Sequence, residues 1–267
     1  MRKVDLISLD LDGTLLDPAG RVTPAAREAV ARAREAGVRV VVNTGRPVPE
    51  AFHFAREAGC DHLVCALGGA AVADCSSGHT VRRWDMDPET GRRVLELCQG
   101  RDIELMIFAG EEIVLDPFSK ESLSRTYPFP IFHSAAVVAE DPRAYLEERG
   151  LPLTKVHGDW NQARYPLEEL GALPGVQLTA SNDHDFELVP DRVDKGRAMA
   201  LIALLYGVPL GETAAVGDSD NDLAVLKAAG LPIAMGNASD RVKAAARLTV
   251  PSNREDGAAQ AILSCLE

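Results

Sequence analysis

Polar residues follow three of the segments in this sequence that predict strands. The runs are Asp10-Leu11-Asp12-Gly13-Thr14, Asn43-Thr44-Gly45-Arg46 and Gly217-Asp218-Ser219-Asp220-Asn221-Asp222. In open parallel sheets the carboxyl ends of the strands meet at one edge, where ligands bind, so we expect these runs to converge. Carboxylates packed together repel one another unless a cation lies among them, and hard oxygen ligands favour Mg²⁺. The pattern therefore predicts a magnesium site.

Two of these carboxyl groups, on Asp10 and Asp12, are suited to phosphoryl transfer. On a strand their side chains would point to the same face, with the amide of Leu11 between them offered to an anion. One carboxylate can attack phosphorus as a nucleophile, while the other gives a proton to the leaving oxygen and later takes one from water. Donors for the phosphoryl oxygens are then available from Thr44, Gly45 and Lys195.

Each of these signals also has an ordinary structural explanation when it is taken alone. The run Asp10-Leu11-Asp12 before Gly13 fits turn chemistry, and Lys195 fits a solvated residue in the first turn of a helix. The acidic run from Asp218 to Asp222 fits a helix start whose carboxylates complement the helix dipole. Their combination, in this order and at strand ends, indicates phosphoryl transfer.

The elements that must position these residues follow from hydrophobic runs and helix caps. Val4 to Leu11 predicts a buried strand that stops at a carboxylate. Thr23-Pro24 and Gly37 bracket a helix as its N-cap and its C-terminal stop. Strands and helices then alternate, with strands at 38–42, 62–66, 213–216 and 232–235 and helices at 49–58, 195–206, 222–229 and 257–265. This alternation predicts a parallel sheet with helices on both faces.

The middle of the chain has a different texture. Helix starts alternate there with short strands, at Asp87-Pro88, Asp141-Pro142 and Asn161-Gln162 and at 104–108, 135–138 and 176–180. We therefore predict an α/β fold: a doubly wound parallel-sheet (Rossmann-like) core domain, residues 1–84 and 189–267, with an inserted α+β domain, residues 85–188. The sequence contains no repeat and no long linker, so both crossings between the domains are expected to be short hinges.

Composition is typical of globular proteins. Of the 267 residues, 46% are hydrophobic and 25% charged, and 28 Lys and Arg against 40 Asp and Glu give a net charge of −12. That sign repels nucleic-acid backbones, so we expect no nucleic-acid partner. The longest apolar run, 198–210, is too short and too interrupted for a membrane span, and Asp5 breaks the apolar stretch of a secretory signal. Five cysteines without a CxxC pair fit reduced, buried thiols, and we expect a cytoplasmic protein.

Taken together, the motifs resemble the haloacid dehalogenase (HAD) superfamily of phosphatases, and within it the Cof-like hydrolases, which carry a large cap after the second motif. The resemblance covers nearly the whole chain. Four motifs carry it in order: Asp10-Leu11-Asp12-Gly13-Thr14-Leu15, Asn43-Thr44-Gly45-Arg46-Pro47, Lys195-Gly196, and Gly217-Asp218-Ser219-Asp220-Asn221-Asp222. Residues 234–238 and 252–257 also resemble stretches of Cof-like members, whereas Gly68 stands where relatives often carry Asn.

The resemblance implies a role for each site residue. Asp10 would be the nucleophile that becomes an aspartyl phosphate, and Asp12 the general acid and base. Mg²⁺ would be held by the Asp10 side chain, the Asp12 backbone carbonyl and Asp218. Asp222 would orient the metal ligands or Lys195 from behind. Contacts to the phosphoryl group would come from the Leu11 amide, Thr44, Gly45, Lys195 and Asn221.

These roles imply a Mg²⁺-dependent phosphomonoester hydrolase acting on small phosphorylated metabolites such as sugar phosphates. The dehalogenases of the superfamily lack an acid at the position of Asp12, so a phosphoester is the expected substrate. The inserted domain would be the cap that closes over the site and selects the leaving group. Candidate cap contacts, each of which also fits an ordinary surface or core position, are His133, Lys155, His157, Trp160 and Asn161. We expect a monomer or a small homo-oligomer.

Two other functions use the same kinds of residue. A phosphomannomutase-like phosphotransferase has the same Asp pair and a comparable cap. A receiver-like signalling module also gathers carboxylates, Thr and Lys at the edge of a doubly wound sheet and is phosphorylated on Asp. Receivers, however, are single, smaller domains whose phosphorylated Asp follows an interior strand, whereas Asp10 ends the first predicted strand.

Overall fold

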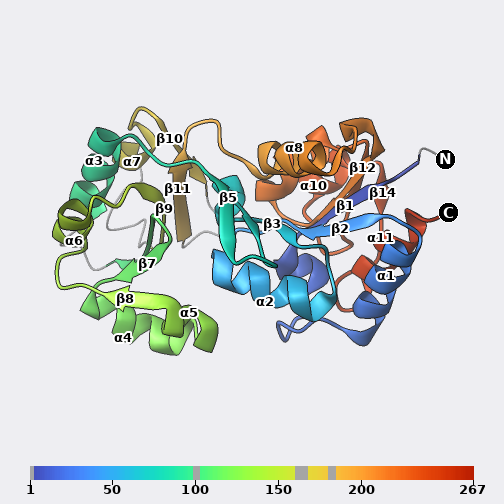
Figure 1. Ribbon diagram of the computed structural model, residues 1–267, viewed down its shortest axis with the longest axis horizontal. Coiled ribbons are helices and arrows are strands. Elements are labelled where there is room, and N and C mark those ends of the chain that lie inside the picture. Colours follow the sequence, from blue (N-terminus) through green and yellow to red (C-terminus); the bar gives the residue numbers. More distant parts are fainter. Residues whose placement is uncertain (1–2, 99–102, 160–167, 180–184) are drawn as a thin grey trace. The chain divides into compact units, whose positions relative to one another are not determined.

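The computed structural model describes residues 3–98, 103–159, 168–179 and 185–267. The chain folds into two compact units. The first, which we call the core unit, comprises Met1–Arg82 and Asp194–Glu267, and the second, the inserted unit, comprises Arg83–Val193. Figure 1 shows the course of the chain, which leaves the core unit once and returns to it.

The core unit contains a five-stranded parallel sheet in the order β14-β13-β12-β1-β2. All four residues of β1 are buried, because helices cover both faces of the sheet. The order places β1 between β2, which follows it in the chain, and β12, which comes from the other end. The strands are β1 (Leu6–Leu9), β2 (Arg39–Val42), β12 (Thr213–Gly217), β13 (Leu231–Ala234) and β14 (Leu248–Thr249). The predicted doubly wound parallel core is confirmed.

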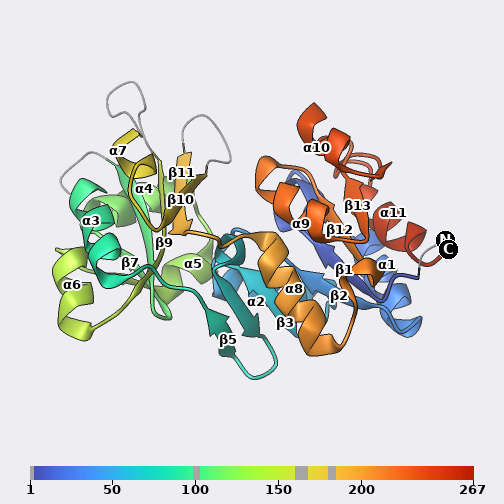
Figure 2. The same ribbon diagram turned by 90° about the horizontal axis from the view of Figure 1, so that it is seen from above.

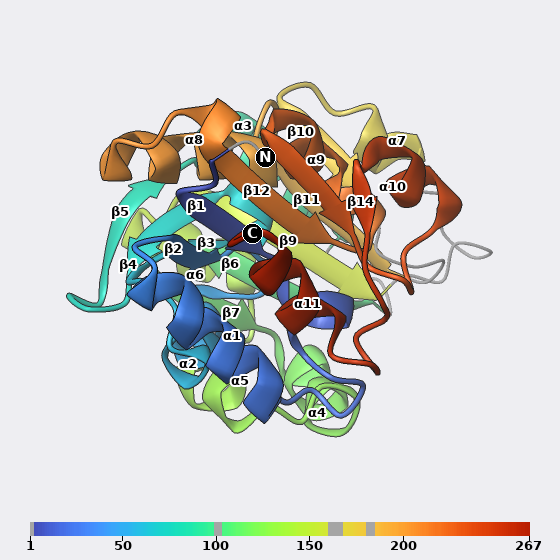
Figure 3. The same ribbon diagram turned by 90° about the vertical axis from the view of Figure 1, so that its right-hand side faces the viewer.

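Helices flank this sheet on both sides. Figure 3 shows α1, α2 and α11 on one side and α8, α9 and α10 on the other. The Thr23 side chain accepts a hydrogen bond from the Ala26 N–H and begins α1, and Gly207, at φ +70°, ends α8. The helices are α1 (Pro24–Glu35), α2 (Val48–Ala58), α8 (Lys195–Tyr206), α9 (Leu223–Ala228), α10 (Asp240–Ala245) and α11 (Gly257–Ser264).

A second, three-stranded sheet in the core unit was not predicted. It consists of β3 (Leu63–Ala66), β4 (Ala71–Asp74) and β5 (His79–Arg83), and β3 and β4 pair antiparallel. One parallel bridge between Asn43 and Cys65 links β3 to the parallel sheet. The chain then reverses direction and forms β4. The turn after β3 contains Gly68 at φ +69°.

The inserted unit is an α+β structure around a six-stranded sheet in the order β10-β11-β9-β6-β7-β8, antiparallel except for the pair β7 and β8. Its strands are β6 (Glu104–Ala109), β7 (Glu112–Leu115), β8 (Ala136–Val138), β9 (Leu153–Asp159), β10 (Val176–Thr179) and β11 (Asp185–Pro190). Its helices are α3 (Pro88–Cys98), α4 (Pro117–Thr126), α5 (Pro130–Ala135), α6 (Pro142–Arg149) and α7 (Glu168–Gly171). The predicted helix start at Asn161-Gln162 lies outside the described residues.

One face of the inserted unit's sheet packs against α3, α6 and α7 (Figure 2). Val94 and Leu95 of α3 and Leu146 of α6 meet Val156 and Phe186 of the sheet in one apolar cluster. β11 continues to Pro190, and the inserted unit ends at Val193, beyond the predicted boundary at residue 188. Within the described residues, no helix combines the length and the apolar character that a membrane crossing requires.

Candidate active site

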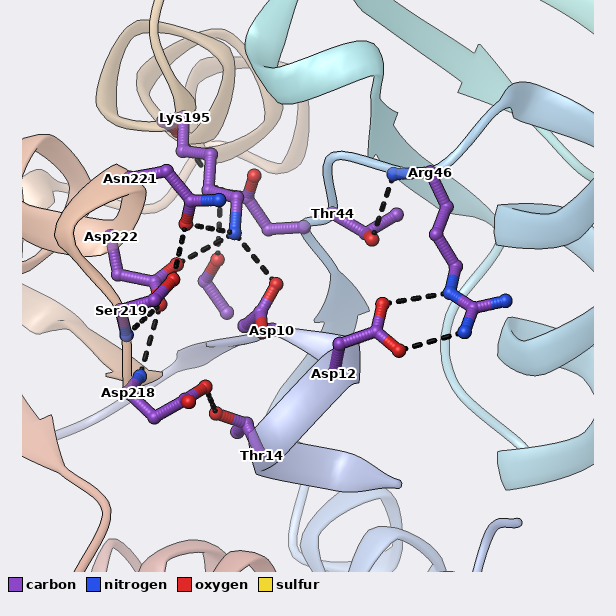
Figure 4. Close-up of polar contacts among 12 residues, drawn as sticks. Asp10, Asp12, Thr14, Thr44, Arg46, Lys195, Asp218, Ser219, Asn221 and Asp222 are labelled. Atoms are coloured by element: carbon purple, nitrogen blue, oxygen red, sulfur yellow. Dashed lines mark hydrogen bonds and ion pairs between the residues drawn. The ribbon is translucent and has the colours of Figure 1, made fainter. Parts of the chain in front are cut away.

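The chain turns sharply where β1 ends. Asp10 follows the strand directly, and residues 11–15 form a turn in which Asp12 and Gly13 have non-helical backbone angles. The prediction that Asp10 and Asp12 alternate along a strand is therefore wrong, because the strand ends at residue 9 and Asp12 lies inside the turn. Figure 4 shows the result: Asp10 points toward Lys195, and Asp12 points toward Arg46.

Gly13 brings this turn into contact with the loop after β12. Its φ is +76°, a conformation that residues other than glycine rarely adopt, and a Cβ atom there would lie 2.2 Å from Oδ2 of Asp218. The hydroxyl of Thr14 donates to Oδ1 of Asp218 (2.9 Å). Nδ2 of Asn237 donates to the Gly13 carbonyl (2.9 Å) and to Oδ2 of Asp218 (3.3 Å). Both oxygens of Asp218 are thus fixed against the turn. Asn237 was missed by the sequence analysis, although it lies in a stretch that resembles Cof-like members.

Lys195, the first residue of α8, points its ammonium into a group of acceptors (Figure 4). Its side chain is only 1% exposed, and its Nζ lies 2.6 Å from Oδ1 of Asp10 and 2.7 Å from Oδ1 of Asp222. A third contact of 3.0 Å joins Nζ to Oδ1 of Asn221. The backbone is held as well, since Nδ2 of Asn43 donates to the Lys195 carbonyl (3.0 Å). A buried ammonium needs such partners, and here they bring three predicted site residues together.

Asp222 organises the loop after β12. Its Oδ2 accepts hydrogen bonds from the backbone N–H groups of Asp218 (3.0 Å) and Ser219 (3.1 Å), while its Oδ1 binds Lys195. Gly217 makes room for this arrangement, because a Cβ atom there would lie 2.5 Å from Cγ of Asp222. Asp222 is thus placed behind Lys195 and Asp218, in contact with both.

The carboxylates of this cluster outnumber the ammonium. Burial raises the pKa of Asp10 well above its ordinary value in spite of Lys195, and the carboxylates of Asp222, Asp218 and Asp12 add to the rise. Burial, and then Asp222, raises the pKa of Asp218 to about 6. Burial by itself would lower the pKa of Lys195, but Asp10 and Asp222 together hold that pKa above its ordinary value. Burial and mutual repulsion thus disfavour the charged forms of these carboxyl groups, and a divalent cation among them would offset both effects.

The residues present fit a magnesium ion. Asp10, Asp218 and Asp222 each offer a carboxylate oxygen, and these atoms lie within 4.8 Å of one another. Among the described residues, these three form the group of acidic, His or Cys side chains that lies close enough together to hold one metal ion. Carboxylate oxygens are ligands that Mg²⁺ prefers. The side chain of Asp12 is turned away toward Arg46, so only its backbone carbonyl can serve the part that the resemblance implies.

Asp12 is held by a guanidinium fork. Nε of Arg46 lies 2.7 Å from Oδ2 of Asp12, and Nη2 lies 2.7 Å from Oδ1. On its other side Arg46 binds the buried Glu50, with 2.5 Å between Nη1 and Oε2. Arg46 was predicted only as part of a motif, and Glu50 was not predicted. The spacing of four residues at the start of a helix was the available signal.

The other predicted phosphate contacts lie at the ends of the same strands. Leu11 is buried in the turn after β1. Thr44, also buried, follows β2, and its hydroxyl accepts a hydrogen bond from the Arg46 N–H (3.1 Å). Gly45 is half-buried beside it. All the predicted site residues therefore belong to the core unit, at the carboxyl ends of β1, β2 and β12 and at the start of α8.

The predicted cap contacts lie in the inserted unit. His133 contacts Nζ of Lys120 (3.1 Å) and the Tyr127 carbonyl (2.9 Å) through its two ring nitrogens. Lys155 is buried, and its Nζ lies 2.6 Å from Oε1 of Glu187, which His157 also approaches at 3.5 Å. Trp160 and Asn161 lie outside the described residues.

Comparisons with known proteins identify the family to which this chain belongs. The sequence profile described as haloacid dehalogenase-like hydrolase matches residues 7–262. Phosphatase YwpJ of Bacillus subtilis is 28% identical over 95% of this chain and 97% of its own length. Pyridoxal phosphate phosphatase YbhA of Escherichia coli is 28% identical over 98% of both chains.

Solved structures agree with the sequence relatives. A haloacid dehalogenase-like hydrolase from B. subtilis superposes with a TM-score of 0.84 at 26% identity, covering 97% of this chain and 99% of the other. One from Bacteroides thetaiotaomicron gives a TM-score of 0.82 at 28% identity, covering 98% and 99%. The chain therefore belongs to the haloacid dehalogenase-like hydrolases, as a phosphatase of that family.

Proposed function

We propose that this protein is a Mg²⁺-dependent phosphomonoesterase that acts on small phosphorylated metabolites through an aspartyl phosphate on Asp10. One observation carries the proposal. Asp10 is buried at the end of β1, with one oxygen on the Lys195 ammonium and with Asp218 near enough to share a cation. The names of two relatives, the pyridoxal phosphate phosphatase and a 5-amino-6-(5-phospho-D-ribitylamino)uracil phosphatase of B. subtilis, support the substrate class.

The first step makes a bond from a carboxylate oxygen of Asp10 to phosphorus. The bond from phosphorus to the ester oxygen breaks, and its electron pair stays on the leaving oxygen. Lys195 and Asn221, which already contact each other, would bind the equatorial phosphoryl oxygens with Thr44 and the Leu11 and Gly45 amides. Mg²⁺ held by Asp10, Asp218 and the Asp12 carbonyl would supply positive charge for the same oxygens.

Asp12 would exchange the protons. It stands apart from the buried cluster, with 58% of its side chain exposed. As an acid it gives its proton to the leaving oxygen, which departs as an alcohol. As a base it then takes a proton from the water whose oxygen attacks phosphorus, and the bond from phosphorus to Asp10 breaks. Inorganic phosphate leaves, and both carboxyl groups return to their starting states.

The inserted unit would be the cap of this enzyme. This unit, predicted as residues 85–188 and observed as Arg83–Val193, would select the leaving group, as expected for a phosphatase with a large insertion after its second motif. Sugar phosphates are the substrates we would test first. A substrate panel separates hydrolysis from transfer, because a phosphotransferase would return an isomerised sugar phosphate in place of inorganic phosphate.

Replacing Asp10 by Asn tests the mechanism. We expect Asp10→Asn to lower turnover of p-nitrophenyl phosphate at saturating Mg²⁺ by at least about 10³-fold, because the amide cannot form the acyl phosphate. The matched control is Asp220→Asn in the loop after β12, whose exposed carboxylate pairs with Arg241. It should keep wild-type turnover. Turnover by purified, folded Asp10→Asn close to the wild-type value would contradict the proposal.

A further inference from the structure

The guanidinium fork on Asp12 points to a residue that acts through another. We infer that Arg46, anchored by Glu50, is a positioning residue that aims the Asp12 carboxyl for its proton transfers; this inference rests on the proposed function. Figure 4 shows the two parallel hydrogen bonds of 2.7 Å that join Arg46 to both oxygens of Asp12. Such a bidentate pair fixes the plane of a carboxylate as well as its place.

Arg46 is rigid because its other contacts are buried. Its side chain is 10% exposed, and the Glu50 carboxylate that binds its Nη1 is 1% exposed. The guanidinium also lies over the ring of Phe54, 5.1 Å from the ring centre. Arg46, Glu50 and Phe54 are spaced four residues apart, so α2 and the residues just before it present all three on one side. The fork is therefore built on a helix of the core unit.

Asp12 needs such a support more than its neighbours do. It is exposed and lies in a turn, so without a partner its side chain would sample several rotamers. A carboxylate has about four lone-pair sites, and the fork occupies two of them. The remaining sites can therefore carry the proton to the leaving oxygen while Arg46 keeps hold. A positioning role differs in its kinetics from a purely structural ion pair between the turn and α2.

The leaving group supplies the test. When Asp10 forms its bond to phosphorus, the departing oxygen takes the electron pair of the broken bond and the proton of Asp12. An alkoxide needs that proton, because it is strongly basic, whereas 2,4-dinitrophenolate departs without it. The value of kcat/KM covers the steps up to this cleavage. If the Asp12 carboxyl group is no longer held in position, kcat/KM must therefore fall far more for alkyl phosphates than for 2,4-dinitrophenyl phosphate.

The first variant is Arg46→Lys, which keeps a positive charge beside Glu50 and removes the fork. With saturating Mg²⁺ we expect kcat/KM for a hexose phosphate to fall about tenfold or more and that for 2,4-dinitrophenyl phosphate to change less than about threefold. The matched control is Arg21→Lys, because Arg21 pairs with Asp17 through the same two kinds of nitrogen at the surface of the core unit. It should change neither value. Equal losses on both esters would overturn the inference and leave the proposed function standing.

A second variant protects the test against misfolding. Arg46→Gln combined with Glu50→Gln removes both charges and leaves no buried charge without a partner. We expect the same selective loss, about a hundredfold on the hexose phosphate, with a cooperative thermal transition. A folded double variant without selectivity between the esters overturns the positioning role. A wild-type protein that hydrolyses neither ester with Mg²⁺ overturns the proposed function, and the inference with it.

Discussion

Gly13 allows two distant parts of the chain to approach within hydrogen-bond distance. The carboxylate of Asp218 occupies the space that a side chain at position 13 would take, and the hydroxyl of Thr14 binds it there. The backbone at Gly13 has a positive φ, so the residue also shapes the turn directly after Asp12. The site therefore depends on the absence of a side chain at Gly13 as well as on the side chains that form hydrogen bonds.

Substitutions of Gly13 and of Gly20, a glycine with a similar φ, test whether the space at Gly13 is needed. Gly20 has a similar φ of +73°, and a Cβ atom there would meet nothing within 4 Å, so Gly20→Ala should cost only the backbone strain of about 1–2 kcal/mol. Gly13→Ala should cost more and should lower turnover about 10²-fold, because the new Cβ displaces Asp218. Urea unfolding and phosphatase assays measure both effects. Equal stability and equal activity of the two variants would show that Asp218 is not constrained by Gly13.

Residue patterns were enough to predict that Lys195 and Asp218 lie near Asp10. Lys195 and Asp218 follow or begin elements whose ends are marked by caps and glycines, and both come to the edge where Asp10 lies. The fork between Arg46 and Asp12 could not be predicted, because nothing local in the sequence states which way Asp12 turns. That direction is set by the turn after β1 and by a helix elsewhere in the chain.

Elements differ in how far local sequence determines them. The limits of α8 agree with the predicted helix at 195–206, since Asp194 caps its start and Gly207 ends it. The strand β9 of the inserted unit was not predicted, because it carries the polar residues Lys155 and His157 beside apolar ones. Those side chains are satisfied by Glu187 on the neighbouring strand β11, a contact that only the folded sheet provides.

The pair of Lys155 and Glu187 makes the stability of the inserted unit depend on acid. Burial by itself would raise the pKa of Glu187, but Lys155 and His157 together hold that pKa well below its ordinary value. The stabilisation is therefore fully present above the ordinary carboxyl pKa and is lost as pH falls below it. At pH 7 we expect Glu187→Gln to lower the free energy of unfolding by about 3 kcal/mol, because the buried ammonium of Lys155 would lose the opposite charge of Glu187.

Denaturant unfolding at two pH values checks this expectation. The difference between wild type and Glu187→Gln should shrink from pH 7 to pH 3. Glu121→Gln is the control in the same unit, because Glu121 and Arg125 are both well exposed, and it should change stability by less than about 0.5 kcal/mol at either pH. A constant difference for Glu187→Gln would contradict the assigned charge state.

At the scale of the whole molecule, a bound metal ion would link the two segments of the chain that form the core unit. Asp10 and Asp218 lie on opposite sides of the inserted unit in the sequence, so an ion bound by both stabilises the folded core. At a Mg²⁺ concentration one hundred times the dissociation constant, we expect a stabilisation of about 2.7 kcal/mol. Thermal unfolding with Mg²⁺ and with chelator should show this shift in wild type and in Asp220→Asn. If Asp218→Asn showed the same shift, the ion would bind elsewhere.

The strand order of the core sheet also constrains how the protein is made. Leu6 in β1 pairs with Thr213 in β12, so during synthesis one edge of the first strand waits without a neighbour until most of the polypeptide has left the ribosome. The inserted unit is contiguous, from Arg83 to Val193, and all of its contacts become available earlier. The inserted unit can therefore complete its sheet before the core unit does, while one edge of β1 stays open to pairing with other chains until β12 is made.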